Sequence, residues 1–237
     1  MPSIILDSEL LYWRLFSSLI VFQTFYNWFQ CCRKYVNKAL KREEDADKSE
    51  NVGWRLCHIC QYYAPPRSFH CKICKACILR QDHHCFFAAG CIGQFTTFYF
   101  VTLCLWLMIG QLVVLYCTFL YVKAEALSWF SLFPPTSLWV SLTGSQPWFN
   151  FLFVVMATCA VLNLAICTFY LLMSTYAATD NVTFHEGSKG IKTFNRGSVV
   201  ANVRAAWGCY YWIRWLLPFY AAPDSNGYDW KVRRHLD

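Results

Sequence analysis

The chain has 237 residues, of which 57% are hydrophobic, 19% aromatic and only 15% charged. A soluble domain carries about 25% charged residues, so this composition indicates a membrane protein and excludes a disordered chain, a coiled coil and a nucleic-acid-binding domain. The net charge of +7 would suit nucleic acid, but the placement of the charges explains it differently, and the 14 cysteines need a separate explanation.

The first expected membrane span lies in an N-terminal segment, residues 1–36. Residues 15–32 carry no charge and come close to the roughly 20 residues of helix that a bilayer core needs. A signal peptide is the alternative. It is disfavoured because Asp7 and Glu9 stand where a basic region is required.

Two longer uncharged runs predict further spans at residues 95–122 and 148–176. The connection between them, residues 123–147, contains Pro134 and Pro135 and is expected to be a poor helix. We predict a non-cytoplasmic loop there.

The basic residues predict the orientation in the membrane. Eleven of the 21 Lys and Arg residues fall in residues 33–94 and eight in the tail, residues 177–237, so both regions are expected in the cytoplasm. The positive charge therefore reflects topology and attraction to anionic lipid, with no nucleic-acid partner.

Residues 37–53 have the mixed charge of a solvated linker, and residues 207–219 predict a short membrane-surface or docking segment. No internal repeat is expected.

Half of the cysteines are concentrated in residues 54–94, which form the expected cysteine-rich domain. Two C-x-x-C pairs lie there together with closely spaced histidines. Disulfides are disfavoured in the cytoplasm, and this spacing is typical of tetrahedral zinc sites.

The number of ligands indicates a further function. Two closed zinc sites need eight ligands, which six cysteines and two histidines would supply. One cysteine and one histidine are then left over, with an aspartate beside them, in the pattern of an activated nucleophile. Counting alone does not decide which residues these are.

The tetrapeptide Asp82-His83-His84-Cys85, within this cysteine-rich frame and between expected spans, resembles the DHHC family of protein S-acyltransferases (palmitoyltransferases). The stretch Pro65-Pro66-Arg67-Ser68 also fits the family. The resemblance implies Cys85 as the nucleophile, His83 as its general base and Asp82 as the orienting carboxylate. It implies two structural zinc ions, one held by Cys57, Cys60, His70 and Cys77, and the other by Cys71, Cys74, His84 and Cys91.

The same resemblance implies transfer of a long-chain acyl group, palmitoyl above all, from acyl-CoA as co-substrate to cysteines of membrane-associated proteins. The fold class that it implies is an integral membrane α-helical protein with a cytoplasmic two-zinc domain, here with three spans where the family norm is four. Membrane lipid is an expected partner, and the Golgi or endoplasmic reticulum is the expected location. The predicted CoA and acyl contacts are Arg67, Lys72, Lys75, Arg80 and Phe87.

Several family features differ in this chain. Phe86-Phe87 replaces the usual Pro-Trp, and the Thr-Thr-x-Glu motif that braces the active site has its nearest candidate at residues 178–181. A catalytically weak family member that acts as a membrane scaffold is therefore the alternative function. A RING-type ubiquitin ligase is a further alternative, but its ligands would be spaced more widely.

Overall fold

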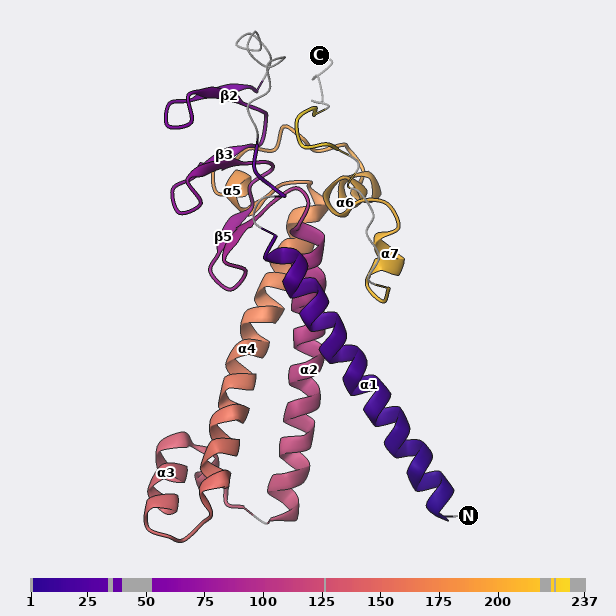
Figure 1. The fold of residues 1–237 in the computed structure, drawn as a ribbon, viewed down its shortest axis with the longest axis vertical. Coiled ribbons are helices and arrows are strands. Elements are labelled where there is room, and N and C mark those ends of the chain that lie inside the picture. The colour runs from indigo at the N-terminus through magenta and orange to yellow at the C-terminus, as the bar shows by residue number, and fades with distance from the viewer. Residues whose placement is uncertain are drawn as a thin grey trace. The chain divides into compact units, whose positions relative to one another are not determined.

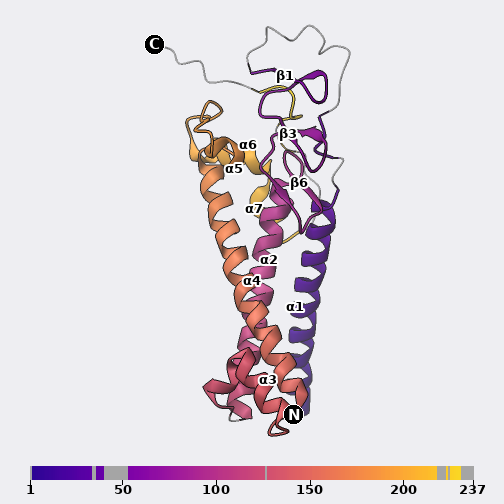
Figure 2. The same cartoon turned by 90° about the vertical axis from the view of Figure 1, so that its left-hand side faces the viewer.

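The computed structural model describes residues 2–33, 36–39, 53–125, 127–217, 223 and 225–230. Figures 1 and 2 show long helices and a set of short hairpins. In chain order, the elements are α1 (Pro2–Cys31), β1 (Arg55–Cys57), β2 (Tyr62–Ala64), β3 (Phe69–Cys71), β4 (Ala76–Ile78), β5 (His83–Cys85), β6 (Gly90–Ile92), α2 (Thr97–Ala124), the 3-10 helix η3 (Trp129–Leu132), α3 (Pro134–Leu142), α4 (Trp148–Thr179), α5 (Phe184–Gly187), α6 (Val199–Trp207) and α7 (Tyr211–Arg214).

The chain divides into two compact units. The first combines residues 1–22 with residues 104–170, and the second combines residues 23–103 with residues 171–237. Helices α1, α2 and α4 contribute to both units because each helix passes from one residue range into the other.

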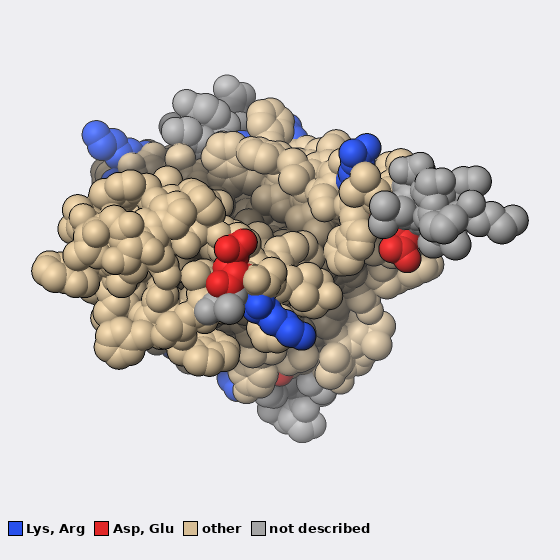
Figure 3. All heavy atoms as spheres, turned by 90° about the horizontal axis from the view of Figure 1, so that it is seen from below, with Lys and Arg blue, Asp and Glu red and all other residues tan. Residues whose placement is uncertain are grey.

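The first unit is built from apolar helix. Within the residues that the structure describes, two helices are long and apolar enough to cross a membrane: α2, with a mean hydropathy of 2.2 over an 18-residue window, and α4, with 2.3 over such a window. They contain most of the predicted second and third spans. Helix α1 runs for 30 residues but is not one of these two, so the first span stays a prediction. The surface at the end that carries α3 shows few charged side chains (Figure 3).

Polar contacts join α2 to α4 inside this unit. The hydroxyl of Tyr121 donates a hydrogen bond of 2.7 Å to Oδ1 of Asn150, and the Tyr121 ring lies 4.6 Å from that of Phe153. Asn150 is buried, so this bond satisfies an amide that would be costly to leave unpaired among apolar side chains.

The prediction of a poor helix between the two spans is wrong for residues Pro134–Leu142, which form the helix α3. Pro134 and Pro135 lie in the first turn of that helix. A proline is tolerated there because the N–H groups of the first turn have no partner within a helix and the fixed φ of proline already suits it.

The second unit contains three antiparallel hairpins, β1–β2, β3–β4 and β5–β6. They share one register, in which Cys57 pairs with Tyr62, Cys71 with Ala76 and Cys85 with Gly90. At the equivalent point of each turn a non-glycine residue adopts positive φ: Gln61 at 57°, Lys75 at 50° and Ala89 at 49°.

These hairpins correct the expectation of no internal repeat. Cys57, Cys71 and Cys85 recur at a constant interval, and each begins a tight turn of the same shape. The repeat is short, and its third copy lacks the second cysteine. Ala88 stands there at the position that Cys60 and Cys74 occupy in the first two copies. Because only the backbone and one cysteine recur in all three copies, the repeat is faint in the sequence.

The start of the predicted solvated linker is buried. The side chain of Asn37 donates to the carbonyl of Cys91 at 3.2 Å and to the hydroxyl of Thr96 at 2.8 Å, and it accepts from the N–H of Phe95 at 2.8 Å. Asn37 therefore fastens the chain before the hairpins to the chain after them. Residues 40–52 of the predicted linker lie outside the described residues.

The predicted apolar tail segment docks onto the start of α2. Trp207 is buried in a cluster with Phe98, Val101 and Ala178. The guanidinium of Arg214 lies 4.1 Å from the centre of the Phe98 ring. Part of α7 remains exposed, so docking involves one face of this segment.

Candidate active site and metal centres

The hairpins bring the predicted metal ligands together in two groups. Each group has three cysteines and one histidine whose ligand atoms lie within 4.8 Å of one another. The first group is Cys57, Cys60, His70 and Cys77, and the second is Cys71, Cys74, His84 and Cys91. In each group the C-x-x-C pair comes from one hairpin, and the histidine and third cysteine come from the next.

The separations between ligand atoms fit tetrahedral zinc. Zn–S bonds of about 2.3 Å and Zn–N bonds of about 2.0 Å at tetrahedral angles place ligand atoms roughly 3.5–3.8 Å apart. Nδ1 of His84 lies 3.5 Å from Sγ of Cys71, 3.3 Å from Sγ of Cys74 and 3.6 Å from Sγ of Cys91. In the first group, Nδ1 of His70 lies 3.3 Å from Sγ of Cys60.

Backbone N–H groups in the hairpin turns complete these groups. The N–H of Cys60 donates to Sγ of Cys57 at 3.4 Å, and the N–H of Cys74 donates to Sγ of Cys71 at 3.4 Å. A donor aimed at sulfur favours the thiolate, which is the form that binds a metal ion. The two Cys₃His groups are therefore consistent with two metal ions.

Cys85 begins the third hairpin turn but belongs to neither metal group. Partial burial raises the pKa of its thiol, but a hydrogen bond with His83 and the N–H groups of Ala88 and Phe87 lower that pKa, and the net effect is a lowered value. The turn that favours a thiolate for metal binding in the first two hairpins thus favours one at Cys85.

His83 lies between Cys85 and a carboxylate. Its Nδ1 is 3.1 Å from Oδ2 of Asp82. Burial lowers the pKa of His83, but the hydrogen bonds with Asp82 and Cys85 outweigh burial and raise that pKa to about 9. The Phe100 ring packs edge-on against the imidazole, with centroids 4.9 Å apart, and limits its rotation.

Asp82 is buried and both of its carboxylate oxygens are engaged. Oδ2 faces His83, and Oδ1 accepts a hydrogen bond of 2.6 Å from the N–H of Phe184, the first residue of α5. The chain beyond α4 therefore fixes the orientation of the Asp82 carboxylate from 102 residues away.

The start of α5 is a capping box. The Thr183 hydroxyl accepts from the N–H of Glu186 at 3.2 Å, and Oε2 of Glu186 accepts from the N–H of Thr183 at 3.0 Å. Thr183-Phe184-His185-Glu186 has Thr and Glu at the first and last positions of the expected bracing motif. The placement of that motif at residues 178–181 is therefore wrong, because it depended on a nearby threonine, whereas Thr followed three residues later by Glu was the signal.

The remaining predicted sites divide by exposure. Lys72 and Lys75 are exposed on the second hairpin turn, and Phe87 is 62% exposed on the third. Arg67 and Arg80 are 3% and 1% exposed, so neither lies at a surface where CoA phosphates would bind. Burial, followed by the nearby charge of Arg67, lowers the pKa of Arg80 to about 9.

The tail contributes a further buried amide. Nδ2 of Asn202 donates to the carbonyl of Thr179 at 2.7 Å, and Oδ1 of Asn202 accepts from the N–H of Arg196 at 2.7 Å. Asn202 thus ties α6 to the end of α4, next to the segment that leads into α5.

The site thus defines a class: a membrane-associated protein with two Cys₃His metal centres and a Cys-His-Asp constellation at a third hairpin. Residues 50–191, more than half of the chain, match the family described as DHHC palmitoyltransferase. The chain belongs to the DHHC palmitoyltransferase family, which is membrane-bound.

Individual relatives agree with this assignment. The chain is 30% identical over 184 residues to "Probable palmitoyltransferase ZDHHC24" of Rattus norvegicus, a match covering 75% of this chain and 64% of the relative. The Homo sapiens protein of the same name is 30% identical over 188 residues, with the same coverage. "Probable protein S-acyltransferase 13" of Arabidopsis thaliana is 46% identical over 57 residues, which are 24% of this chain and 19% of the relative. The chain therefore spans under two thirds of the length of these relatives.

Proposed function

We propose that this protein transfers a long-chain acyl group, palmitoyl above all, from acyl-CoA to cysteine thiols of membrane-associated proteins, with Cys85 as the nucleophile. One observation carries the proposal: Cys85 lies outside both metal groups and in contact with His83, whose other neighbour is Asp82. Membership of the DHHC family supports it.

In the first step His83 accepts the thiol proton of Cys85, and the sulfur attacks the thioester carbonyl of acyl-CoA. A C–S bond forms to Cys85, the C–S bond to CoA breaks, and the CoA sulfur takes the proton from His83. Asp82 keeps the imidazole oriented and stabilises its protonated form.

In the second step the thiol of a substrate cysteine gives its proton to His83 and attacks the acyl-Cys85 thioester. The acyl group moves to the substrate sulfur, and Cys85 recovers its proton from His83. One thioester replaces another in each step, so neither step needs an external energy source. The two Cys₃His groups would hold two zinc ions, which would supply structural stability to the hairpins and take no part in either transfer.

The placement of Cys85 suits an amphipathic donor. The adjoining turn presents Phe86 and Phe87 as exposed aromatic side chains, and the second turn presents Lys72 and Lys75. An acyl chain gains about 0.8 kcal/mol for each CH₂ that it buries in apolar surroundings, whereas the phosphates of CoA favour cations. We place the reaction at the cytoplasmic face of the Golgi or endoplasmic reticulum membrane, by the distribution of basic residues and by family resemblance.

The test is acyl labelling. The purified full chain is incubated with labelled palmitoyl-CoA, and we expect a hydroxylamine-sensitive label on Cys85 that Cys85→Ser abolishes while two zinc ions per chain are retained. Cys209→Ser, a change outside the site, serves as the matched control and should label normally. A wild-type protein that binds two zinc ions and takes up no label would overturn the proposal.

A second function, a catalytically weak membrane scaffold, has one specific observation in its favour. Phe184 occupies the second position of the bracing motif, where the family has threonine, so only its backbone N–H is available to Asp82. This function predicts that Cys85→Ser leaves the cellular role intact.

A further inference from the structure

The segment from Ser225 to Trp230 forms a compact turn held by its own polar side chains. Oδ1 of Asn226 accepts from the N–H of Tyr228 at 2.9 Å and from the N–H of Asp229 at 3.0 Å. The indole N–H of Trp230 donates to the carbonyl of Gly227 at 3.1 Å. Gly227 has a φ of +86°, which favours glycine, and the turn fixes the indole relative to it.

This turn is docked on the hairpins. Nε2 of Gln94 donates to the carbonyl of Ser225 at 2.8 Å. Gly227 is buried, and a Cβ at that position would lie 3.1 Å from Cδ1 of Leu79. Tyr228 packs on the hydrophobic cluster that contains Leu79 and the metal-group residue Cys77. Docking at three points gives Trp230 a defined position.

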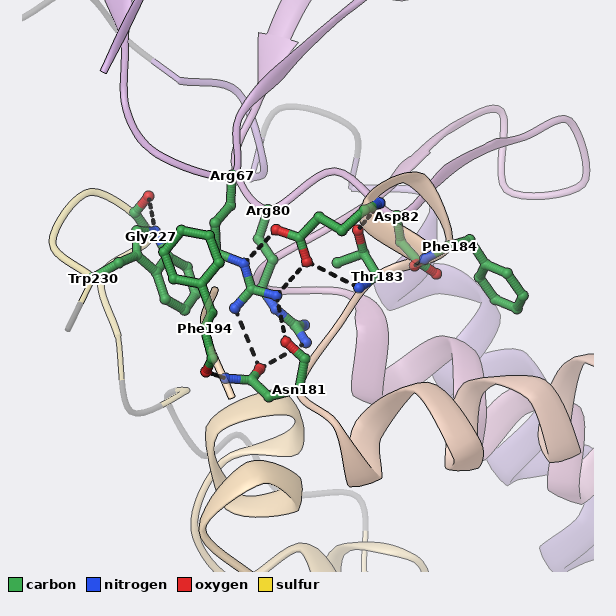
Figure 4. Close-up of polar contacts among 10 residues, drawn as sticks. Arg67, Arg80, Asp82, Asn181, Thr183, Phe184, Phe194, Gly227 and Trp230 are labelled. Atoms are coloured by element: carbon green, nitrogen blue, oxygen red, sulfur yellow. Dashed lines mark hydrogen bonds and ion pairs between the residues drawn. The ribbon is translucent and has the colours of Figure 1, made fainter. Parts of the chain in front are cut away.

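Trp230 covers the guanidinium of Arg67. Cζ of Arg67 lies 4.5 Å from the centre of the Trp230 ring and 4.7 Å from the centre of the Phe194 ring (Figure 4). The guanidinium is fully buried, and its edge is occupied by acceptors: Oε1 of Glu186 at 2.6 Å from Nε, Oε2 of Glu186 at 2.5 Å from Nη2, and the carbonyl of Asn181 at 2.7 Å from Nη2. Aromatic rings therefore take the place of water over the guanidinium plane.

The contacts continue from Arg67 to Asp82. Glu186, held by Arg67, accepts from the N–H of Thr183, and the next N–H, that of Phe184, donates to Oδ1 of Asp82 (Figure 4). A rotation of the Arg67 guanidinium would move Glu186, and Glu186 sets the backbone direction at Thr183. Through Arg67 and Glu186, the ring of Trp230 therefore affects the position of the Phe184 N–H that holds the Asp82 carboxylate in place.

We propose that Trp230 is a positioning residue for acyl transfer, which acts through Arg67 and Glu186 to orient Asp82 against His83. This rests on the proposed acyltransferase function. Phe194 holds the same guanidinium and shares the role. Both aromatic residues contact the guanidinium of Arg67, and we assign each an effect on the rate through geometry alone.

The experiment compares Trp230→Ala, Trp230→Phe and the matched control Trp212→Ala in the full chain. Trp212 is 64% exposed on α7, and its truncation removes the same side chain outside this set of contacts. We expect Trp230→Ala to slow acylation of Cys85 about tenfold with two zinc ions per chain retained, because small displacements of reacting groups are costly. Trp230→Phe and Trp212→Ala should stay within about twofold, since phenylalanine keeps a ring over the guanidinium.

A double-mutant cycle separates positioning from general destabilisation. In a Glu186→Gln background, Trp230→Ala should add less than about twofold, because both changes interrupt one set of contacts. A wild-type rate for Trp230→Ala, or an undiminished loss in the Glu186→Gln background, would overturn the proposal.

Alkylation of Cys85 by iodoacetamide, located by peptide mapping, distinguishes this inference from the acyltransferase proposal. If the wild type takes up no acyl label, acyl transfer fails as the function. Slower alkylation of Cys85 in Trp230→Ala than in Trp212→Ala would then still support positioning, and equal rates would refute it.

Discussion

The hairpins β3–β4 and β5–β6 share a register and a turn, yet both turn positions of the first belong to a Cys₃His group and neither turn position of the second does. Cys71 and Cys74 occupy those positions in the first case, whereas Cys85 and Ala88 occupy them in the second. The backbone N–H groups of both turns face the first cysteine. The comparison teaches that this turn favours a thiolate at its first cysteine whether or not that cysteine belongs to a metal group.

The position of the third hairpin, last of the three along the chain, explains why its turn belongs to no metal group. Each metal group takes its histidine and third cysteine from the hairpin that follows. After β6 the chain enters α2 at Thr97, so among the described residues no further hairpin follows to complete a third group. His83 and Asp82 take the place of those ligands beside Cys85.

The largest expected effect is a difference in metal content between variants of Cys71 and Cys85, the first cysteines of the second and third hairpin turns. Cys71→Ser should lose the second metal ion and unfold the adjoining hairpins, because structural zinc contributes about 10–16 kcal/mol in small zinc-binding peptides. Cys85→Ser should keep two metal ions and lose acyl labelling completely. Metal content by atomic spectroscopy and labelling with palmitoyl-CoA measure both. Equal metal loss in the two variants would contradict the comparison.

A smaller effect is expected from the buried ion pair between Arg67 and Glu186, which would stabilise the second hairpin in addition to metal. Glu186→Gln leaves the buried guanidinium of Arg67 without its carboxylate, which should cost about 3–5 kcal/mol of unfolding free energy. Chemical denaturation in detergent, followed through metal release, measures this.

Asp180→Asn is the control for that prediction, because it breaks a partly exposed pair with Lys192 at 3.6 Å. Its cost should lie within about 1 kcal/mol. A similar cost for the two variants would mean that burial of the Arg67–Glu186 pair has no consequence.

Restoring the missing ligand sharpens the comparison further. Ala88→Cys should create a weak site with Cys85 and His83, so that added zinc inhibits acylation of the variant and not of the wild type. Ala88 is buried, and the larger side chain should cost about 1–3 kcal/mol. Ala88→Ser has a similar size and should show no zinc inhibition, as measured by titrating zinc into the labelling assay.

The smallest effect concerns the exposed face of the second hairpin turn, which carries Lys72 and Lys75. Replacing Lys72 and Lys75 by alanine should raise KM for acyl-CoA about threefold at low salt, and the difference should shrink at high salt because screening weakens exposed charges. Lys192→Ala, outside the hairpins, should leave KM unchanged. Steady-state rates at two ionic strengths measure the effect, and a KM shift independent of salt would assign the lysines another role.

Local patterns in the sequence predicted metal binding and the apolar spans, and the family resemblance divided the ligands into two groups. Two C-x-x-C pairs indicate zinc ligands, since tetrahedral zinc sites use cysteines at this short spacing. The length of an uncharged run indicates a membrane span, because it matches the thickness of a bilayer. Cys85, His83 and Asp82 are adjacent in the chain, so family resemblance was enough to single them out as candidates.

Long-range contacts were beyond the sequence. Arg67 looks like a solvated cation until Glu186, 119 residues away, is placed against it. The same holds for Asn37, which bonds to Thr96 over a separation of 59 residues. Burial was the deciding quantity in both cases, and burial belongs to the folded molecule.

The sequence by itself thus determined that the chain carries metal-ligand groups and apolar spans, because these depend on residue type and local spacing, and the family resemblance predicted which residues bind metal and which is the nucleophile. Only the tertiary structure decided that Arg67 is buried against Glu186, that Thr183 and Glu186 form a capping box beside Asp82, and that Trp230 covers the guanidinium of Arg67. The physical reason is that a charge or a ring acquires its role from what replaces water around it, and those neighbours come from distant parts of the chain.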